Sequence, residues 1–303
     1  MPITTKIANI TRGSLHDGKG IRTVVYFKGC NLHCKWCHNP ECISFKPQIL
    51  YAPNKCIQCG ICVELCNEHH LIDKDKHVYI KDGCVGCGRC ASSCPVNSLE
   101  LCGVYILPQD LLKEILKDKP YYDTSSGGVT FSGGECLLHT SYLQDICRMC
   151  KDEGISITIE SALNVPWENI NLILPYVDDF YIDIKHMDDS IHRYFTGGSN
   201  TKVLENLKGL ARVHESILVR TPLIPGVNDS FDNLLSTALF ALNCGVKGVE
   251  LLRYNFLGKS KYSLLQDDYV SFLETSQSKE YMDELCKQLS SRVNREGFVF
   301  WVE

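Results

Sequence analysis

The chain has 303 residues, and its 31 Lys and Arg against 36 Asp and Glu give a formal net charge of −5. This weak acidic balance argues against nucleic-acid binding, and no apolar run reaches the roughly 18 residues that a membrane span needs. Hydrophobic residues make up 44% and charged residues 22%, as in ordinary globular proteins. Because residues 1–15 lack a continuous apolar stretch, we expect no signal peptide and a cytoplasmic protein.

Strands and helices are predicted to alternate along most of the chain. The first strand is expected at 22–29, where β-branched and aromatic residues are frequent. Residues 53–103 show little periodicity, which indicates an insert held together by metal rather than by a core. Further strands are expected at 128–132, 155–161, 178–186, 217–222, 247–253 and 298–302, and helices at 108–117, 142–153, 201–213, 230–243 and 279–295.

This alternation predicts an α/β fold with a parallel sheet and right-handed crossovers. In such sheets the active site lies at the C-terminal ends of the strands. We therefore expect the chemistry in the loops that follow the strands. The expected division is a main domain of residues 1–52 and 104–303, with residues 53–103 as the insert.

Cysteine is unusually frequent, with 18 copies. Twelve of them lie between Cys30 and Cys94, and eleven of those twelve fall into three tight motifs. Disulfide scaffolds are usually short secreted chains, whereas clustered cysteines in a cytosolic chain of this size more often bind metal. For most of the other seven cysteines, including the Cys147-x2-Cys150 pair in a predicted helix, we expect packing as small buried residues.

The first motif, Cys30-x3-Cys34-x2-Cys37, stands at the end of the first predicted strand. Three thiolates can bind three irons of a [4Fe–4S] cube, whereas a full set of ligands would be four. The fourth iron would then be open to a small molecule, as in catalytic metal sites with a vacant position. The alternative is a structural zinc site completed by His38 or Cys42.

This motif after a first strand resembles the radical S-adenosylmethionine (SAM) superfamily. Ser132, Gly133, Gly134 and Glu135 follow the next strand of the predicted sheet, where the superfamily keeps its GGE motif. Alone, this segment could be a simple turn. Other segments narrow the resemblance to the activating enzymes of glycyl radical enzymes: HDGKGIR at 16–22, CHNPE at 37–41, VTFSGGE at 129–135, DIK at 183–185, and Arg220 with Pro225-Gly226.

The resemblance implies an open-sided, partial (β/α)6 TIM-like barrel that binds SAM on the cluster with the open iron. It assigns the SAM carboxylate to Lys185, the adenine to Trp36, and the SAM amino end to the backbone of residues 132–135. The remaining implied roles are these: Glu160 and Ser161 lie near the amino group, Asp183 is a polar or monovalent-cation partner, Arg220 holds SAM or the radical intermediate, Asn255 contacts adenosine, and Asp17 faces the partner's glycine loop.

For Glu160, Asp183 and Arg220 the alternative is an ordinary hydrogen-bonded residue at the barrel end. The sequence also departs from the family pattern at three positions. Lys19 replaces a usual Pro, Cys136 follows GGE where Pro is common, and Asn255 stands where many members have His. An asparagine can still donate and accept hydrogen bonds.

The second and third motifs repeat the run C-x2-C-x2-C-x3-C of bacterial ferredoxins, in which the fourth cysteine ligates the other cluster. Zinc is the alternative, but eight cysteines in a doubled spacing favour two further [4Fe–4S] clusters. Such an insert either relays electrons from a reduced flavodoxin or ferredoxin or braces the fold and docks the partner. The expected ligand sets are Cys56, Cys59, Cys62 and Cys94 for one cluster, and Cys84, Cys87, Cys90 and Cys66 for the other.

The resemblance thus implies an anaerobic enzyme, expected to be a monomer. It would cleave SAM reductively to a 5′-deoxyadenosyl radical and abstract hydrogen from a glycine Cα of a partner glycyl radical enzyme. One alternative is another radical SAM enzyme that modifies a peptide or small molecule with auxiliary clusters. Another is a plain electron carrier, which would hold about eight irons instead of about twelve.

Overall fold

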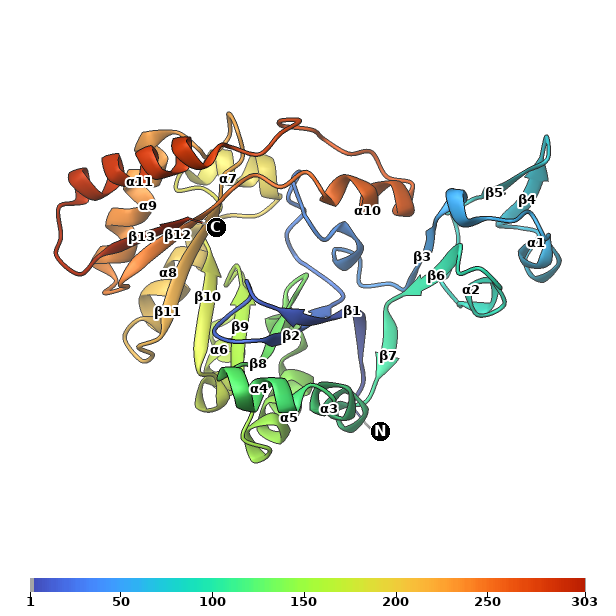
Figure 1. The fold of residues 1–303 in the computed structure, drawn as a ribbon, viewed down its shortest axis with the longest axis horizontal. Coiled ribbons are helices and arrows are strands. Elements are labelled where there is room, and N and C mark those ends of the chain that lie inside the picture. Colours follow the sequence, from blue (N-terminus) through green and yellow to red (C-terminus); the bar gives the residue numbers. More distant parts are fainter. Residues whose placement is uncertain (1–2, 303) are drawn as a thin grey trace.

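The computed structural model describes residues 3–302. Its centre is a nine-stranded sheet in the order β13-β12-β11-β10-β9-β8-β2-β1-β7. From β2 to β13 each strand runs parallel to its neighbour, and the strands follow one another in chain order (Figure 1). The parallel strands are β2 (Arg22–Phe27), β8 (Gly128–Gly133), β9 (Ser156–Ser161), β10 (Asp179–Asp183), β11 (Ile217–Pro222), β12 (Gly248–Leu252) and β13 (Val299–Val302).

The α/β fold and every predicted strand of the parallel sheet are therefore confirmed. Two antiparallel strands at the edge, β1 (Thr5–Ser14) and β7 (Val104–Ile106), were not predicted. Strand β1 carries mostly exposed or half-exposed residues, so its sequence lacks the apolar alternation that marks a half-buried strand.

Helices cover the outer face of the parallel strands. The predicted ones are α3 (Pro108–Leu116), α5 (Thr140–Asp152), α8 (Thr201–Leu210), α9 (Phe231–Asn243) and α11 (Lys279–Val293). Four helices of seven or eight residues were not predicted, because so short a segment shows little of the helical period. These are α4 (Lys119–Ser125), α6 (Trp167–Ile173), α7 (Asp189–Thr196) and α10 (Gly258–Leu265).

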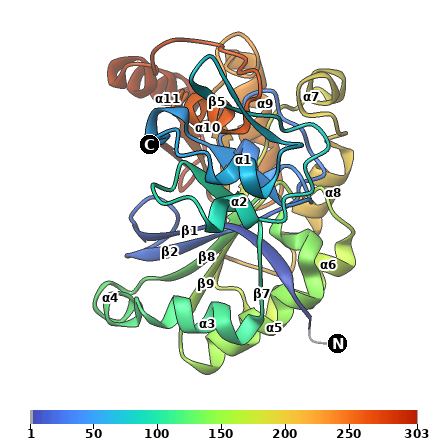
Figure 2. The same cartoon turned by 90° about the vertical axis from the view of Figure 1, so that its right-hand side faces the viewer.

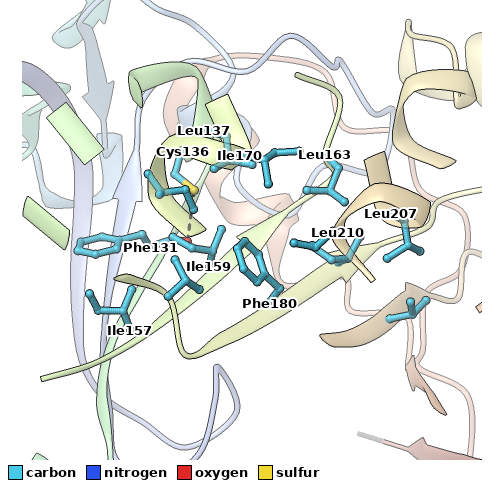
Figure 3. Packing of buried hydrophobic residues seen from close by; sticks show 14 of the residues in the cluster. Phe131, Cys136, Leu137, Ile157, Ile159, Leu163, Ile170, Phe180, Leu207 and Leu210 are labelled. Carbon is cyan, nitrogen blue, oxygen red and sulfur yellow. Dashed lines mark hydrogen bonds between the residues drawn. The ribbon is translucent and has the colours of Figure 1, made fainter. Parts of the chain in front are cut away.

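The main core lies between the sheet and these helices, apart from α7 and α10, which contribute no residue to it (Figure 3). Phe131, Ile159 and Phe180 point outward from three neighbouring strands and are fully buried against apolar side chains such as Ile170 and Leu207. Of the seven cysteines outside the motifs, five are buried, which confirms the packing interpretation for most of them. These five are Cys42, Cys102, Cys136, Cys147 and Cys150, while Cys244 and Cys286 are partly exposed.

The segment that carries the second and third cysteine motifs projects from one side of the barrel (Figures 1 and 2). It has its own small core, centred on Tyr51, Tyr79 and Leu99. Contrary to the expectation of little regular structure, it contains six short elements of four or five residues, too short to show a period. They are β3 (Gln48–Tyr51), α1 (Ile61–Leu65), β4 (His70–Asp73), β5 (Lys76–Tyr79), α2 (Arg89–Ser92) and β6 (Leu99–Cys102).

Polar contacts fix this segment against the end of α10. Lys81 Nζ pairs with Asp267 and donates to the Gln266 carbonyl at 2.8 Å, and Gln266 Nε2 donates to the Tyr79 carbonyl at 3.1 Å. The cysteine-rich segment therefore has a defined position relative to the barrel. Within residues 3–302, no helix combines the length and apolar character needed to cross a membrane.

Candidate active site and cluster-binding loops

A layer of polar side chains lines the inner face of the sheet near the C-terminal ends of the strands. Strand register builds this layer, because Cα partners on adjacent strands point to the same face. Tyr26 pairs with Ser132, and Glu160 with Tyr181. Asp183 of β10 pairs with Arg220 of β11, and Arg220 pairs with Glu250 of β12.

These strands surround a cavity of about 780 Å³ that has room for a nucleoside-sized ligand. All three cysteines of the first motif line it, beside Lys185 and the backbone of the SGGE segment. The structure also brings the other predicted SAM-site residues to this cavity, with Glu135 as the one exception. Those residues are Trp36, Ser132, Gly133, Gly134, Glu160, Ser161, Asp183, Arg220 and Asn255. Asp17, predicted to face the partner's glycine loop, lines the same cavity.

The loop with the first motif is held by backbone hydrogen bonds. His33 and Lys35 N–H groups donate to the Thr196 and Phe195 carbonyls at 2.7 and 2.9 Å, and Cys30 N–H donates to the Ile43 carbonyl at 3.0 Å. Burial raises the pKa of the Cys30 and Cys37 thiols to about 12. These side chains are therefore protonated thiols until a metal takes the place of the proton.

The thiols fit an iron–sulfur cube better than a zinc ion. Sulfurs around a tetrahedral zinc lie about 3.8 Å apart, given Zn–S bonds of about 2.3 Å. Within residues 3–302, Cys62, His70 and His77 form the group of metal-ligand residues whose ligand atoms all lie within 4.8 Å of one another, so at least one pair of the Cys30, Cys34 and Cys37 sulfurs is farther apart than that. This wider spread suits separate irons of one cluster.

Two ion-pair systems flank the cysteines. Lys185 Nζ lies 2.9 Å from Asp183 Oδ2, with 12% of the Lys185 side chain exposed. Burial alone would lower the pKa of Lys185, but the Asp183 carboxylate, with Cys34 in its thiolate form, outweighs it, and the net direction is upward. Lys185 is therefore a fixed positive charge beside the first motif.

Arg220 of β11 bridges two partly buried carboxylates, one on β9 and one on β12, whose side chains are each 18% exposed. Its Nη1 lies 2.7 Å from Glu160 Oε1, and its Nε lies 2.8 Å from Glu250 Oε2. The guanidinium also lies 5.2 Å from the centroid of the Tyr181 ring. Burial raises the pKa of Glu160 to about 7, and the positive charge of Arg220 opposes this rise. The opposition is incomplete because Arg220 pairs with Glu250 as well.

Glu135 lies beneath the cavity and acts as a structural anchor in this structure. Its carboxylate accepts hydrogen bonds from Ser161 Oγ at 2.9 Å, from Ala162 N–H at 3.1 Å and from Leu137 N–H at 3.3 Å. Burial raises its pKa to about 7. The glutamate thus ties the loop after β8 to the loop after β9, and it is not among the residues that line the cavity.

The two glycines of the same segment are required by backbone packing. Gly133 has φ +111°, and a Cβ there would lie 2.2 Å from the Phe27 backbone nitrogen. A Cβ on Gly134 would lie 2.3 Å from the Gly29 carbonyl oxygen and 2.5 Å from that of Cys42. The SGGE loop therefore lies directly against the backbone that leads into the first cysteine motif.

An aromatic wall closes the side of the cavity where adenine was predicted. Trp36 is 9% exposed and packs with Ile224 and Tyr254. Its ring lies 5.9 Å from that of Phe195 and 6.1 Å from that of Phe272. Such a surface suits the face of a purine ring.

The HDGKGIR segment is anchored by its arginine. The fully buried Arg22 side chain donates to Thr130 Oγ1 at 2.7 Å and to the Ser156 carbonyl at 3.1 Å. Lys19, which replaces a proline of the family pattern, lies 3.0 Å from Asp179. Asp17 is thereby placed at the cavity and accepts a hydrogen bond from Ser14 Oγ.

Tyr26, Tyr181 and Tyr254 also line the cavity and were not predicted from the sequence. Alternation along β10 could have identified Tyr181, which stands two residues before Asp183 and so points to the same face. Tyr26 and Tyr254 had no such signal. Tyr26 is brought to the cavity by the pairing of β2 with β8, and Tyr254 lies in the loop after β12.

In the projecting segment the cysteines gather as two sets. Cys56, Cys59, Cys62 and Cys94, the first predicted set, line a small second cavity together with Cys90 of the other set. Near the other set, burial and the neighbouring Cys84, Cys90 and Cys66 thiols raise the pKa of Tyr79. The exchange of the fourth cysteine between the two motifs is thus consistent with the positions of the side chains.

Comparison with known proteins shows the superfamily to which the chain belongs. Residues 83–238 match the family model described as the Radical SAM superfamily, residues 51–101 match a 4Fe-4S dicluster domain, and residues 16–74 match a 4Fe-4S single cluster domain. A radical SAM methyltransferase from Sphaerobacter thermophilus has a similar fold, with a TM-score of 0.55 at 12% identity over 99% of this chain and 76% of that one. The molecule is an iron–sulfur protein of the radical SAM class.

Curated relatives define the family within this class. The (2S)-3-sulfopropanediol dehydratase activating enzyme of Klebsiella oxytoca is 40% identical over 86% of this chain and 84% of its own length. The trans-4-hydroxy-L-proline dehydratase activating enzyme of Clostridioides difficile is 38% identical over 92% and 94%. The indoleacetate decarboxylase activating enzyme of Tractidigestivibacter scatoligenes is 37% identical over 87% of each chain.

The chain belongs to the family of activating enzymes of glycyl radical enzymes. It is a radical SAM enzyme whose protein substrate is a glycyl radical enzyme.

Proposed function

We propose that the chain carries three [4Fe–4S] clusters. The observation that supports this most directly is the convergence of Cys30, Cys34 and Cys37 with Lys185 and the polar layer on one roomy cavity. Residues 53–103 form the second domain of the proposal, inserted into a barrel of residues 1–52 and 104–303. The two proposed sets in this insert are Cys56, Cys59, Cys62 and Cys94, and Cys84, Cys87, Cys90 and Cys66.

In this proposal SAM lies in the cavity, with its methionine end towards Lys185 and its adenine against Trp36. Lys185 attracts the carboxylate as a point charge. The backbone of the SGGE segment and Ser161 receive the amino end, while Arg220 with Glu160 fixes the position of the ribose and sulfonium region. Asp183 holds Lys185 and, in the same layer, is the proposed partner of a monovalent cation. Asn255 and the aromatic wall complete the adenosine site.

When bound, the cluster and SAM supply one-electron cleavage of the S–C5′ bond and a 5′-deoxyadenosyl radical, which abstracts hydrogen from the partner's glycine Cα. The protein supplies orientation and exclusion of water. Trp36 and the neighbouring aromatic side chains shield the reacting end from solvent. Asp17, in the loop after β1, lies at the cavity where the glycine-bearing loop would enter.

The partner is proposed only as a glycyl radical enzyme, because relatives of nearly equal identity, 40, 38 and 37%, are named for different ones. We also propose a monomer in the cytoplasm, where thiols remain reduced. The electron donor is a reduced flavodoxin or ferredoxin that docks at the insert. The exposure of Cys59 and Cys87, one from each proposed ligand set, supports docking of such a donor at the insert.

Replacing Cys56 and Cys84 by Ala tests the role of the insert as an electron relay. We expect the doubly substituted chain to lose SAM cleavage with reduced flavodoxin but to retain it with a strong chemical reductant, because each broken ligand set removes one step between donor and SAM cluster. The measurement is 5′-deoxyadenosine formed per chain with each reductant. Cys286→Ala, at a partly exposed cysteine of α11, is the control and should behave as the unmodified enzyme. Equal loss with both reductants would instead make the insert a brace for the fold.

A further inference from the structure

Two buried histidines lie beside the proposed ligand set of Cys56, Cys59, Cys62 and Cys94. His70 of β4 and His77 of β5 are 1% and 7% exposed. Their rings stack with centroids 5.1 Å apart, and His70 Nδ1 lies 3.0 Å from His77 Nε2. The same Nε2 atom lies 3.2 Å from the Cys62 sulfur. His77 therefore stands in hydrogen-bond contact with a proposed cluster ligand.

Neighbouring residues hold His77 in this position. Its backbone N–H donates to Gln58 Oε1 at 2.5 Å, and its carbonyl accepts from the Tyr51 hydroxyl at 3.0 Å. The Tyr51 ring also meets the imidazole edge to face, with centroids 4.9 Å apart. Because Gln58 lies between Cys56 and Cys59, the loop with the cluster ligands itself orients the histidine.

The contacts of the two ring nitrogens select the tautomer. His77 Nδ1 is buried and has no hydrogen-bond partner among the described residues. An unpartnered buried acceptor is tolerated better than an unpartnered N–H, so the proton belongs on Nε2. A metal-bound thiolate can only accept, and its negative charge favours an N–H over a lone pair. Nε2–H thus points to the Cys62 sulfur and shares its hydrogen with His70 Nδ1.

We propose that His77 donates a hydrogen bond from Nε2 to the Cys62 sulfur and thereby raises the reduction potential of the cluster held by Cys56, Cys59, Cys62 and Cys94. This inference rests on the cluster assignment proposed above. Reduction adds negative charge to the cluster, and a hydrogen bond to a ligand sulfur stabilises that charge. With this bond, the cluster at Cys62 accepts an electron more readily than it would without it. The two auxiliary clusters therefore differ in the hydrogen bonds to their ligand sulfurs.

The other interpretation of this group is a single metal ion, since the ligand atoms of Cys62, His70 and His77 lie within 4.8 Å of one another. The Cys62 sulfur cannot serve that ion and a cube at once. Cys62 shares the second cavity with Cys56, Cys59 and Cys94, which favours the cube. A bound zinc, with about four fewer irons per chain, would overturn both the inference and the cluster assignment.

The test uses the full chain with Cys30, Cys34 and Cys37 replaced by Ala, so that only the two auxiliary clusters remain. A content of about eight irons checks the cluster assignment by itself. Redox titration followed by electron paramagnetic resonance then compares this chain with its His77→Phe variant, which keeps an aromatic ring but has no N–H. We expect one of the two midpoint potentials to fall and the other to stay.

The matched control is His69→Phe, at a half-buried histidine of the same segment whose Nδ1 lies 3.1 Å from the Ile80 carbonyl. It should leave both potentials unchanged. Unchanged potentials in His77→Phe, or an equal shift in the control, would overturn the inference. Should His77→Phe fail to load iron, the unmodified enzyme with ¹⁵N-labelled histidine decides the matter. Hyperfine coupling from histidine nitrogen to one reduced auxiliary cluster supports the inference, and no such coupling overturns it.

Discussion

Cys34→Ala is expected to abolish SAM cleavage and to lower the iron content from about twelve to about eight per chain. Cys34 lines the cavity with Cys30 and Cys37, and its thiol lies in the field of Lys185. Two thiolates cannot hold the cube, whereas the eight cysteines of the insert are untouched by the change. The measurements are iron analysis of the anaerobically purified chain and the yield of 5′-deoxyadenosine.

The control for this change is Cys244→Ala, at a partly exposed cysteine that follows α9. It should retain about twelve irons and full cleavage activity. If Cys34→Ala also kept about twelve irons and cleaved SAM, the assignment of the first motif as the SAM cluster site would be wrong.

Arg220→Met is expected to have the second large effect, because it leaves Glu160 and Glu250 buried without their shared cation. Removing one partner of a buried ion pair typically costs about 3–5 kcal/mol of unfolding free energy. Loss of a charge-assisted contact to SAM should also lower kcat/KM for SAM by roughly 100-fold. Anaerobic denaturant unfolding and SAM-cleavage kinetics measure the two effects separately.

Arg220→Lys and Arg212→Met complete this test. A lysine can pair with one of the two carboxylates but lacks the planar fork that reaches both, so an intermediate loss is expected. Arg212 is exposed after α8, and its replacement should change neither stability nor kinetics. An Arg220→Met enzyme as stable and as active as the unmodified one would contradict the proposed role of this ion-pair row.

Sequence patterns predicted the elements that are long or fully buried. Strands such as β8 and β11 carry runs of apolar and β-branched residues between turn signals, and α5 and α9 span more than three turns. The hairpin strand β1 lacks the apolar alternation that marks a half-buried strand, and helices of seven or eight residues offer too few positions for a period to show. Tertiary contacts, rather than local propensity, define those elements.

The residues of the site also divide into those that a sequence motif identified and those that only the fold brings together. Cysteine spacing identified Cys30, Cys34 and Cys37 because ligands of one cluster lie close along the chain. Glu135 shows the limit of a motif: the segment was located correctly, but the side chain points beneath the cavity and binds Ser161. His77 carries no motif at all, and only the pairing of β4 with β5 and the packing on Tyr51 bring it to Cys62.

The most direct test of the account is to mix the reduced enzyme anaerobically with SAM and a glycyl radical enzyme from the same organism. Electron paramagnetic resonance then follows the radical on the partner. We predict a glycine-centred doublet that collapses when the partner carries glycine deuterated at Cα, with the deuterium recovered in 5′-deoxyadenosine. A partner that stays free of radical while SAM is cleaved, or 5′-deoxyadenosine without the label, would contradict hydrogen abstraction from that glycine.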